Sequence, residues 1–114
     1  MDEMKLKSAG VDYDMALERF VGNRMLYEKF LKKFVTDEHV ENVKKAYLKK
    51  DYNEMFEQAH ALKGVAGTLG MNSLYQASTE LVDVLRAGIY DDIEDMLKRL
   101  EAESEKMLQL LQDE

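Results

Sequence analysis

Hydrophobic residues recur along this chain at intervals of three and four, the repeat of an amphipathic α-helix. The clearest stripe runs between residues 55 and 69, and a second runs between residues 93 and 111. The spacing of the first stripe is typical of the seam of a helical bundle. Its members are Met55, Ala59, Leu62, Ala66 and Leu69, and those of the second stripe are Ile93, Leu97, Leu100, Ser104, Met107 and Leu111.

Capping residues predict shorter elements in the first part of the chain. Residues 1–10 mix charged and polar side chains, and we expect a flexible segment there. Asp12 can cap a short helix over residues 13–20, which the Gly22-Asn23 pair would end. Asn23 can cap the next helix, whose stripe resumes beyond Thr36-Asp37. This pattern fits either one long helix with a shifted face or two helices, and the stripe consists of Leu26, Phe30, Phe34, Val40, Val43 and Tyr47.

Similar signals mark the ends of the later helices. A capping box, in which Gln76 follows Ser73 by three residues, predicts the start of one helix. Glycines at positions 70 and 88 are expected to end helices, the first in a left-handed conformation. The other expected first residues are Asp51 or Asn53, and Asp91 or Asp92.

The chain has 114 residues, no proline and only six glycines, so few helix breakers are present. Hydrophobic residues make up 46% and charged residues 34%, which is an ordinary balance for a folded domain. We therefore predict an all-α fold in one domain over residues 1–114. The architecture expected is an up-down antiparallel four-helix bundle with a short extra N-terminal helix.

Charge and cysteine usage exclude several classes of function. A net charge of −7 makes nucleic acid and acidic membrane surfaces unfavourable partners. The absence of cysteine rules out disulfides, zinc–thiolate sites and thiol nucleophiles. Neither a signal peptide nor an apolar run of about 20 residues is visible. A cytoplasmic monomer is expected.

A second line of residues runs beside the stripe of the third long helix. It contains Phe56, His60, Lys63 and Gly67, with Gly64 one turn after the histidine. Each glycine inside a helix costs about 1 kcal/mol relative to alanine, so stability alone does not explain two of them. An imidazole nitrogen is nucleophilic near neutral pH. Lys63 can offset the charge of a phosphoryl group, while Gly64 and Gly67 leave room for a partner to approach.

The segment HALKGVAGTLG over residues 60–70 resembles the signature H-x-L-K-G-x-A-x-x-L-G of histidine-containing phosphotransfer (HPt) domains. The sequence ALERF at residues 16–20 followed by Gly22, the Phe30/Phe34 stripe and residues 81–88 are also similar to that family. The resemblance extends from about Val11 into the last predicted helix.

This resemblance implies a carrier without kinase or phosphatase activity, in a multistep two-component phosphorelay. His60 would be the phospho-acceptor, through Nε2, Lys63 its charge-stabilising neighbour and Gly64 the residue that gives access. We expect Gly67 to contribute to a docking face. The implied partners are receiver domains of response regulators, a hybrid sensor histidine kinase, or both. No cofactor is expected in this chain, since Mg²⁺ would belong to the receiver.

One position departs from the family pattern. Many members carry a glutamine on the following helix that forms a hydrogen bond near the histidine. Here the antiparallel register places Val82 at that level, with Thr79, Asp83 and Arg86 nearby, and Gln76 lies too close to the turn. We expect Thr79 or a water molecule to orient His60 instead.

Metal binding and self-phosphorylation are other possible roles for a chain with these residues. Glu57 and His60 have the E-x-x-H spacing of di-iron bundles, but the motif occurs once, so no metal site is expected. The chain has no phosphate-binding loop, so self-phosphorylation is not expected. His39 lies among polar residues and is expected to be an ordinary surface histidine. The alternative functions are a helical adaptor that is not phosphorylated and the phosphorylatable domain of a chemotaxis-type kinase.

Overall fold

The computed structural model describes residues 1–112, and the prediction of an all-helical chain is confirmed over this range. More helices are present than the four long and one short helix expected, because the first third of the chain is divided more finely. The elements are α1 (Glu3–Ser8), α2 (Tyr13–Arg19), α3 (Arg24–Lys33), the 3₁₀ turn η1 (Phe34–Thr36), α4 (His39–Leu48), α5 (Tyr52–Leu69), α6 (Asn72–Ala87) and α7 (Ile93–Gln112).

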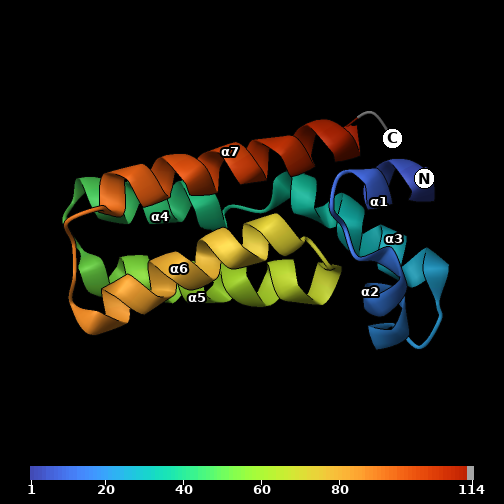
Figure 1. Cartoon of the computed structure of the whole chain (residues 1–114), viewed down its shortest axis with the longest axis horizontal. Helices are drawn as coiled ribbons and strands as arrows, with labels where there is room; N and C mark the ends of the chain where they lie inside the picture. Colours follow the sequence, from blue (N-terminus) through green and yellow to red (C-terminus); the bar gives the residue numbers. More distant parts are fainter. Residues whose placement is uncertain (113–114) are drawn as a thin grey trace.

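Helices α4 to α7 lie side by side along the long axis of the molecule, and α1 to α3 gather at one end (Figure 1). Each of the four packs against the next, and α7 returns to pack against α4. Within α4 to α7 the chain direction reverses at each connection (Figure 1), since these connections are only a few residues long. None of the helices described has the length and apolar character needed to cross a bilayer.

The expectation of a flexible segment over residues 1–10 was wrong for most of that range. Residues Glu3–Ser8 form α1, and the side chain of Asp2 caps it by accepting a hydrogen bond from the Lys5 backbone N–H. Leu6 is fully buried in the core. A single apolar side chain among charged ones therefore anchors this segment, and the polar composition of the segment concealed that anchor.

The open question at Thr36-Asp37 is resolved in favour of two helices. The 3₁₀ turn η1 follows α3 directly, and Asp37 then adopts an extended conformation with ψ of 134°. A carboxylate oxygen of Asp37 accepts a hydrogen bond of 2.9 Å from the backbone N–H of His39, the first residue of α4. Asp37 thus ends one helical segment and supports the start of the next.

The predicted ends of α5 are confirmed. Asp51 caps its first turn through a 3.1 Å hydrogen bond from the Glu54 N–H, and Gly70 ends it with φ of +78°. All five residues of its predicted stripe are buried, as are all six predicted inner residues of α7. Both helices therefore present the predicted faces to the core.

The predicted capping box of α6 was wrong. The helix begins at Asn72, with Met71 in the capping position and no side-chain hydrogen bond there. Met71 is buried, forms an antiparallel bridge with Val11, and donates its backbone N–H to Ala66 over 2.9 Å. The bond to Ala66 is local, whereas the bridge to Val11 is a tertiary contact that fixes Met71 just before the helix, so that α6 starts one residue before Ser73. Gly88 ends it, as predicted, with φ of +71°.

Candidate functional site

The site lies on the outer side of α5, whose inner side is fixed in the core. Ala59, directly before His60, and Leu62, two residues after it, are completely buried. His60 itself is exposed to solvent. Burial of one stripe therefore directs the imidazole outward from a helix held along its whole length.

The two glycines of α5 differ in what surrounds them. A Cβ atom at Gly64 would meet nothing within 4 Å, so the surface one turn after His60 is open. A Cβ at Gly67 would lie only 3.1 Å from the Tyr75 ring of α6. Gly64 thus leaves space for an approaching molecule, whereas Gly67 allows α6 to pack closely against α5; a docking role for Gly67 stays a prediction.

These residues share one shallow hollow that is open to solvent, with a volume of about 340 Å³. Arg19 reaches it from α2 and donates a hydrogen bond to the Gly67 carbonyl. Tyr75 reaches it from α6. Sequence reasoning missed both residues, because no local spacing connects them with His60. The hollow is lined by Arg19, His60, Lys63, Gly64, Gly67, Thr68 and Tyr75.

Lys63 is half-buried, which is less exposure than a solvated surface lysine would have. Its ammonium nitrogen lies 5.9 Å from the centroid of the Tyr75 ring, within range of a cation–π interaction. Its side chain lines the same hollow as His60. The cation expected beside the histidine is therefore held against α6.

On the other side of His60, towards the start of α5, Phe56 forms a ring contact with it. The two rings are stacked with centroids 5.8 Å apart and an angle of 21° between their planes. The guanidinium carbon of Arg86, on α6, lies 5.5 Å from the centroid of the Phe56 ring. The sequence showed the i, i+4 spacing of Phe56 and His60, but it did not predict that their rings are in contact.

The residues at the level of the family's usual glutamine do not replace it. Val82 is completely buried. Thr79 was one of two expected partners of His60, the other being a water molecule, and its hydroxyl donates to the Tyr75 carbonyl at 2.8 Å instead. Within residues 1–112, His60 therefore has a ring contact but no hydrogen bond to a protein group.

His39 is half-buried rather than a freely exposed surface residue. Its Nδ1 lies 2.9 Å from both carboxylate oxygens of Asp37. The pair joins η1 to α4 and leaves His39 engaged, in contrast to His60. Among the residues described, no three His, Cys, Asp or Glu side chains come together to hold a metal ion.

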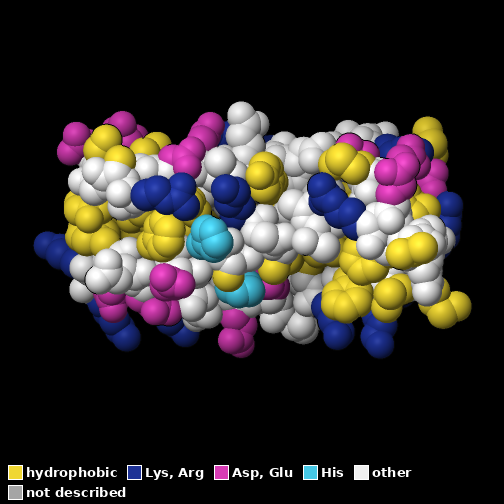
Figure 2. Space-filling view, turned by 90° about the horizontal axis from the view of Figure 1, so that it is seen from below, with side chains coloured by type: hydrophobic (Ala, Val, Ile, Leu, Met, Phe, Trp, Pro, Cys, Tyr) yellow, Lys and Arg dark blue, Asp and Glu magenta, His cyan; other side chains and the backbone are white. Residues whose placement is uncertain are grey.

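Figure 2 looks onto the face where both histidine side chains reach the surface, with Lys and Arg side chains nearby. Arg19 and Lys63 line the hollow that contains His60, whereas Arg86 lies over the ring of Phe56 and 4.0 Å from the carboxylate of Asp83. The described residues that line the hollow include Arg19 and Lys63 and no acidic residue, although the chain as a whole carries a charge of −7. This local positive charge suits an anion at His60.

An all-helical domain that presents an unobstructed histidine among cationic side chains has the features of a histidine phosphocarrier. Residues 29–114 match the family model of the Hpt domain, and the chain belongs to this family. Hpt domains take part in histidine phosphotransfer in phosphorelays and are phosphocarrier modules rather than kinases or phosphatases. They interact with kinase and receiver domains of two-component systems. Neither the search of curated proteins nor that of solved structures found a match.

Proposed function

We propose that this chain carries a phosphoryl group on His60 between aspartates of receiver domains in a multistep phosphorelay. The observation that carries the proposal is the exposed imidazole beside Gly64, where a side chain would otherwise stand and where space is open. A receiver active site must bring its aspartyl phosphate against the ring, and this position gives it room to do so.

In the proposed transfer, the lone pair of His60 Nε2 attacks the phosphorus of an aspartyl phosphate. An N–P bond forms, and the P–O bond to the aspartate breaks with its electron pair going to the carboxylate. The imidazole ring releases the Nδ1 proton to water. The reverse sequence passes the phosphoryl group to the next aspartate.

The surrounding side chains support this step electrostatically. The phosphoryl oxygens bring negative charge to a surface where Lys63 and Arg19 line the same hollow as His60. Cations close to a phosphoryl group form charge-assisted hydrogen bonds, which are stronger than neutral ones. Lys63 is the charge-stabilising residue in this proposal, and Gly64 is the residue that gives access.

An apolar hollow next to the site supports contact with a protein partner. It has a volume of about 470 Å³, and it shares Gly64 and Thr68 with the hollow around His60. Phe30 and Val65 contribute apolar surface to it. A receiver that covers His60 would also cover this surface, which would exclude water from part of the interface.

The proposed function also includes the fold that supports α5, the oligomeric state, the location and the cofactor requirement. Helices α4 to α7 act as an up-down bundle that holds α5 rigid. The carrier works as a cytoplasmic monomer and needs no cofactor of its own, with Mg²⁺ held by the receiver. The net charge of −7 and the absence of cysteine support this setting.

The proposal is tested by incubating the protein with several receiver domains phosphorylated on aspartate. Wild type should take up phosphate, and His60→Gln should take up none. His39→Gln is the matched control, since it removes the other histidine, which is engaged with Asp37. Absence of uptake by wild type from every receiver would favour the adaptor function instead.

A further inference from the structure

Phe56 stands out as the aromatic neighbour of the phospho-acceptor. Its ring stacks on the His60 imidazole one helical turn away, at a centroid distance of 5.8 Å and with nearly parallel planes. Offset stacking at this separation is a favourable arrangement of two aromatic rings. The contact therefore limits the orientations that the imidazole can adopt.

The orientation of His60 matters because the attacking lone pair must point along the line of the breaking P–O bond. An exposed imidazole without a hydrogen bond can rotate about its Cβ–Cγ bond. The contacts of Gly67 with Tyr75 and of Phe56 with Arg86 set the register of α5 and α6. In this register the residue of α6 opposite His60 is the buried Val82, whose side chain offers no polar group. Stacking on Phe56 is thus the contact that can select one ring orientation.

Phe56 is itself held in place by the protein. It is half-buried and packs against the core cluster. The guanidinium of Arg86 lies over its ring at 5.5 Å, and Arg86 also lies 4.0 Å from the carboxylate of Asp83 on the same helix. A ring that is fixed by the core and by α6 can transmit its orientation to the imidazole.

We propose that Phe56, held by Arg86, is a positioning residue that fixes the plane of the His60 imidazole for phosphoryl transfer. The inference rests on the proposed function, since it concerns the same reaction. In this chain the aromatic contact within α5, and not a hydrogen bond from α6, orients the His60 imidazole. Phe56 does not touch the phosphoryl group in this scheme and acts only through His60.

The test compares Phe56→Leu with Phe56→Tyr and with Tyr52→Leu. Leucine keeps most of the apolar bulk but has no ring, whereas tyrosine keeps the ring. Tyr52 lies one turn earlier on the same side of α5 and stacks on Tyr90, at 4.0 Å, rather than on the histidine. Tyr52→Leu therefore removes an aromatic contact from the same helix without touching His60.

Two measurements are made on each variant, along with its melting temperature. The first is the NMR shift of the imidazole protons in the unphosphorylated protein, which the ring current of Phe56 should displace. The second is the rate of phosphoryl transfer at saturating phosphorylated receiver. Phe56→Leu should abolish the displacement and lower the maximal rate about two- to tenfold, the range for loss of one aromatic pair. Phe56→Tyr should restore both, with receiver affinity unchanged throughout.

The inference is overturned if Phe56→Leu transfers phosphate at the wild-type rate, or if Tyr52→Leu slows transfer as much. An imidazole shift that is the same in wild type and Phe56→Leu would also overturn it, and this measurement needs no receiver. If wild type itself accepts no phosphate, the proposed function fails first. An active wild type with an unimpaired Phe56→Leu variant defeats this inference alone.

Discussion

At the scale of single residues, the surface of α5 combines an exposed histidine with a position that has no side chain. His60 is exposed, and Gly64 one turn later leaves open space. Lys63 lies between them in sequence and rests against the ring of Tyr75. In the proposed function Gly64 gives access, Lys63 supplies charge and His60 is the nucleophile. Each can be changed separately, so each leads to its own prediction.

Replacing Lys63 with alanine should slow phosphoryl transfer about tenfold, equivalent to about 1.4 kcal/mol of lost transition-state stabilisation. The reason is the loss of positive charge from the hollow that it shares with His60. Lys63 makes no ion pair among the described residues, and its ammonium contacts the Tyr75 ring only at 5.9 Å, so the melting temperature should change by only a few degrees. Transfer kinetics and thermal unfolding check both parts, with the exposed Lys98→Ala as the control. A large loss of stability would assign Lys63 a structural role instead.

Gly64→Gln should block transfer while leaving the helix intact. The added side chain would occupy the open surface beside the imidazole. Gly64→Ala serves as the control for the backbone: its Cβ meets no atom within 4 Å, so it should stabilise the fold by roughly 0.5–1 kcal/mol. Denaturant unfolding and transfer assays measure these effects. Normal transfer by the glutamine variant would contradict the access role.

At the scale of elements, the ends of α5 and α6 show how similar glycines can carry different constraints. Gly70 and Gly88 both adopt left-handed backbone conformations at a helix end, with φ of +78° and +71°. A Cβ at Gly70 would lie 2.6 Å from the backbone oxygen of Asp12, whereas one at Gly88 would meet nothing within 4 Å. The first glycine thus permits a tertiary approach as well as a turn.

Gly70→Ala should therefore destabilise the fold by more than Gly88→Ala. The Gly88 variant bears only the strain of a left-handed alanine, about 1–2 kcal/mol. The Gly70 variant bears this strain, and its Cβ must also displace the backbone of Asp12. This displacement would disturb the 2.8 Å hydrogen bond that the Asp12 N–H donates to the Gly70 carbonyl. Chemical denaturation of the two variants gives the comparison. Equal losses would show that the approach of Asp12 adds no constraint.

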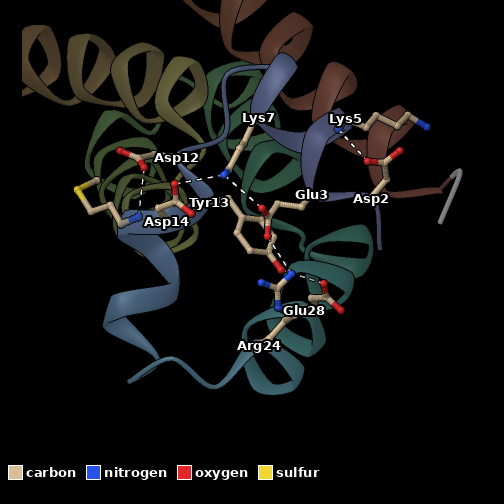
Figure 3. A network of polar contacts seen from close by, with 10 residues as sticks. Asp2, Glu3, Lys5, Lys7, Asp12, Tyr13, Asp14, Arg24 and Glu28 are labelled. Carbon is tan, nitrogen blue, oxygen red and sulfur yellow. Dashed lines mark hydrogen bonds and ion pairs between the residues drawn. The ribbon is translucent and has the colours of Figure 1, made fainter.

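At the scale of the whole molecule, the N-terminal helices are joined by a network of ion pairs and tyrosine contacts (Figure 3). Lys7 lies 3.2 Å from Glu3 and from Asp14, and Arg24 pairs with Glu3 at 2.8 Å. Beneath these exposed pairs, the buried rings of Tyr13 and Tyr27 meet edge to face at 5.1 Å. The buried tyrosines make the larger energetic contribution, since exposed ion pairs contribute little to stability.

The two tyrosines also predict how stability changes at alkaline pH. Burial, together with a hydrogen bond to Glu28, raises the pKa of Tyr13 to about 12, and burial raises the pKa of Tyr27 as well. In the unfolded chain these phenols ionise near pH 10, so between pH 10 and 12 the folded state binds more protons than the unfolded state. Stability should be fully present below pH 10 and fall as the pH rises towards 12.

Thermal unfolding across this pH range tests that prediction. Tyr13→Phe removes one of the titrating groups, so its melting temperature should fall less steeply with pH than that of wild type. The comparison uses the slope of the curve, because loss of the hydrogen bond to Glu28 can lower stability at every pH. Identical slopes in the two proteins would rule out a contribution from Tyr13.

Much of the fold could be predicted because it depends on local repeats. The stripe of α5, from Met55 to Leu69, fixes which face is buried and hence where His60 points. Asp12, Asn23 and Asp51 cap the helices assigned to them, since a capping hydrogen bond joins residues only three apart. The start of α6 was mispredicted because the bridge between Val11 and Met71 joins residues far apart in the chain.

By itself, the sequence determined that the chain is helical, that it belongs to the Hpt family, and which residues share the side of α5 that carries His60. Only the tertiary structure decided what surrounds His60. It placed Arg19 and Tyr75 in the same hollow, and it left Val82 buried and Thr79 bonded within its own helix. The physical reason is range: periodicity and capping act over a few residues, whereas the packing of helices places Arg19 of α2 and Tyr75 of α6 beside His60 of α5.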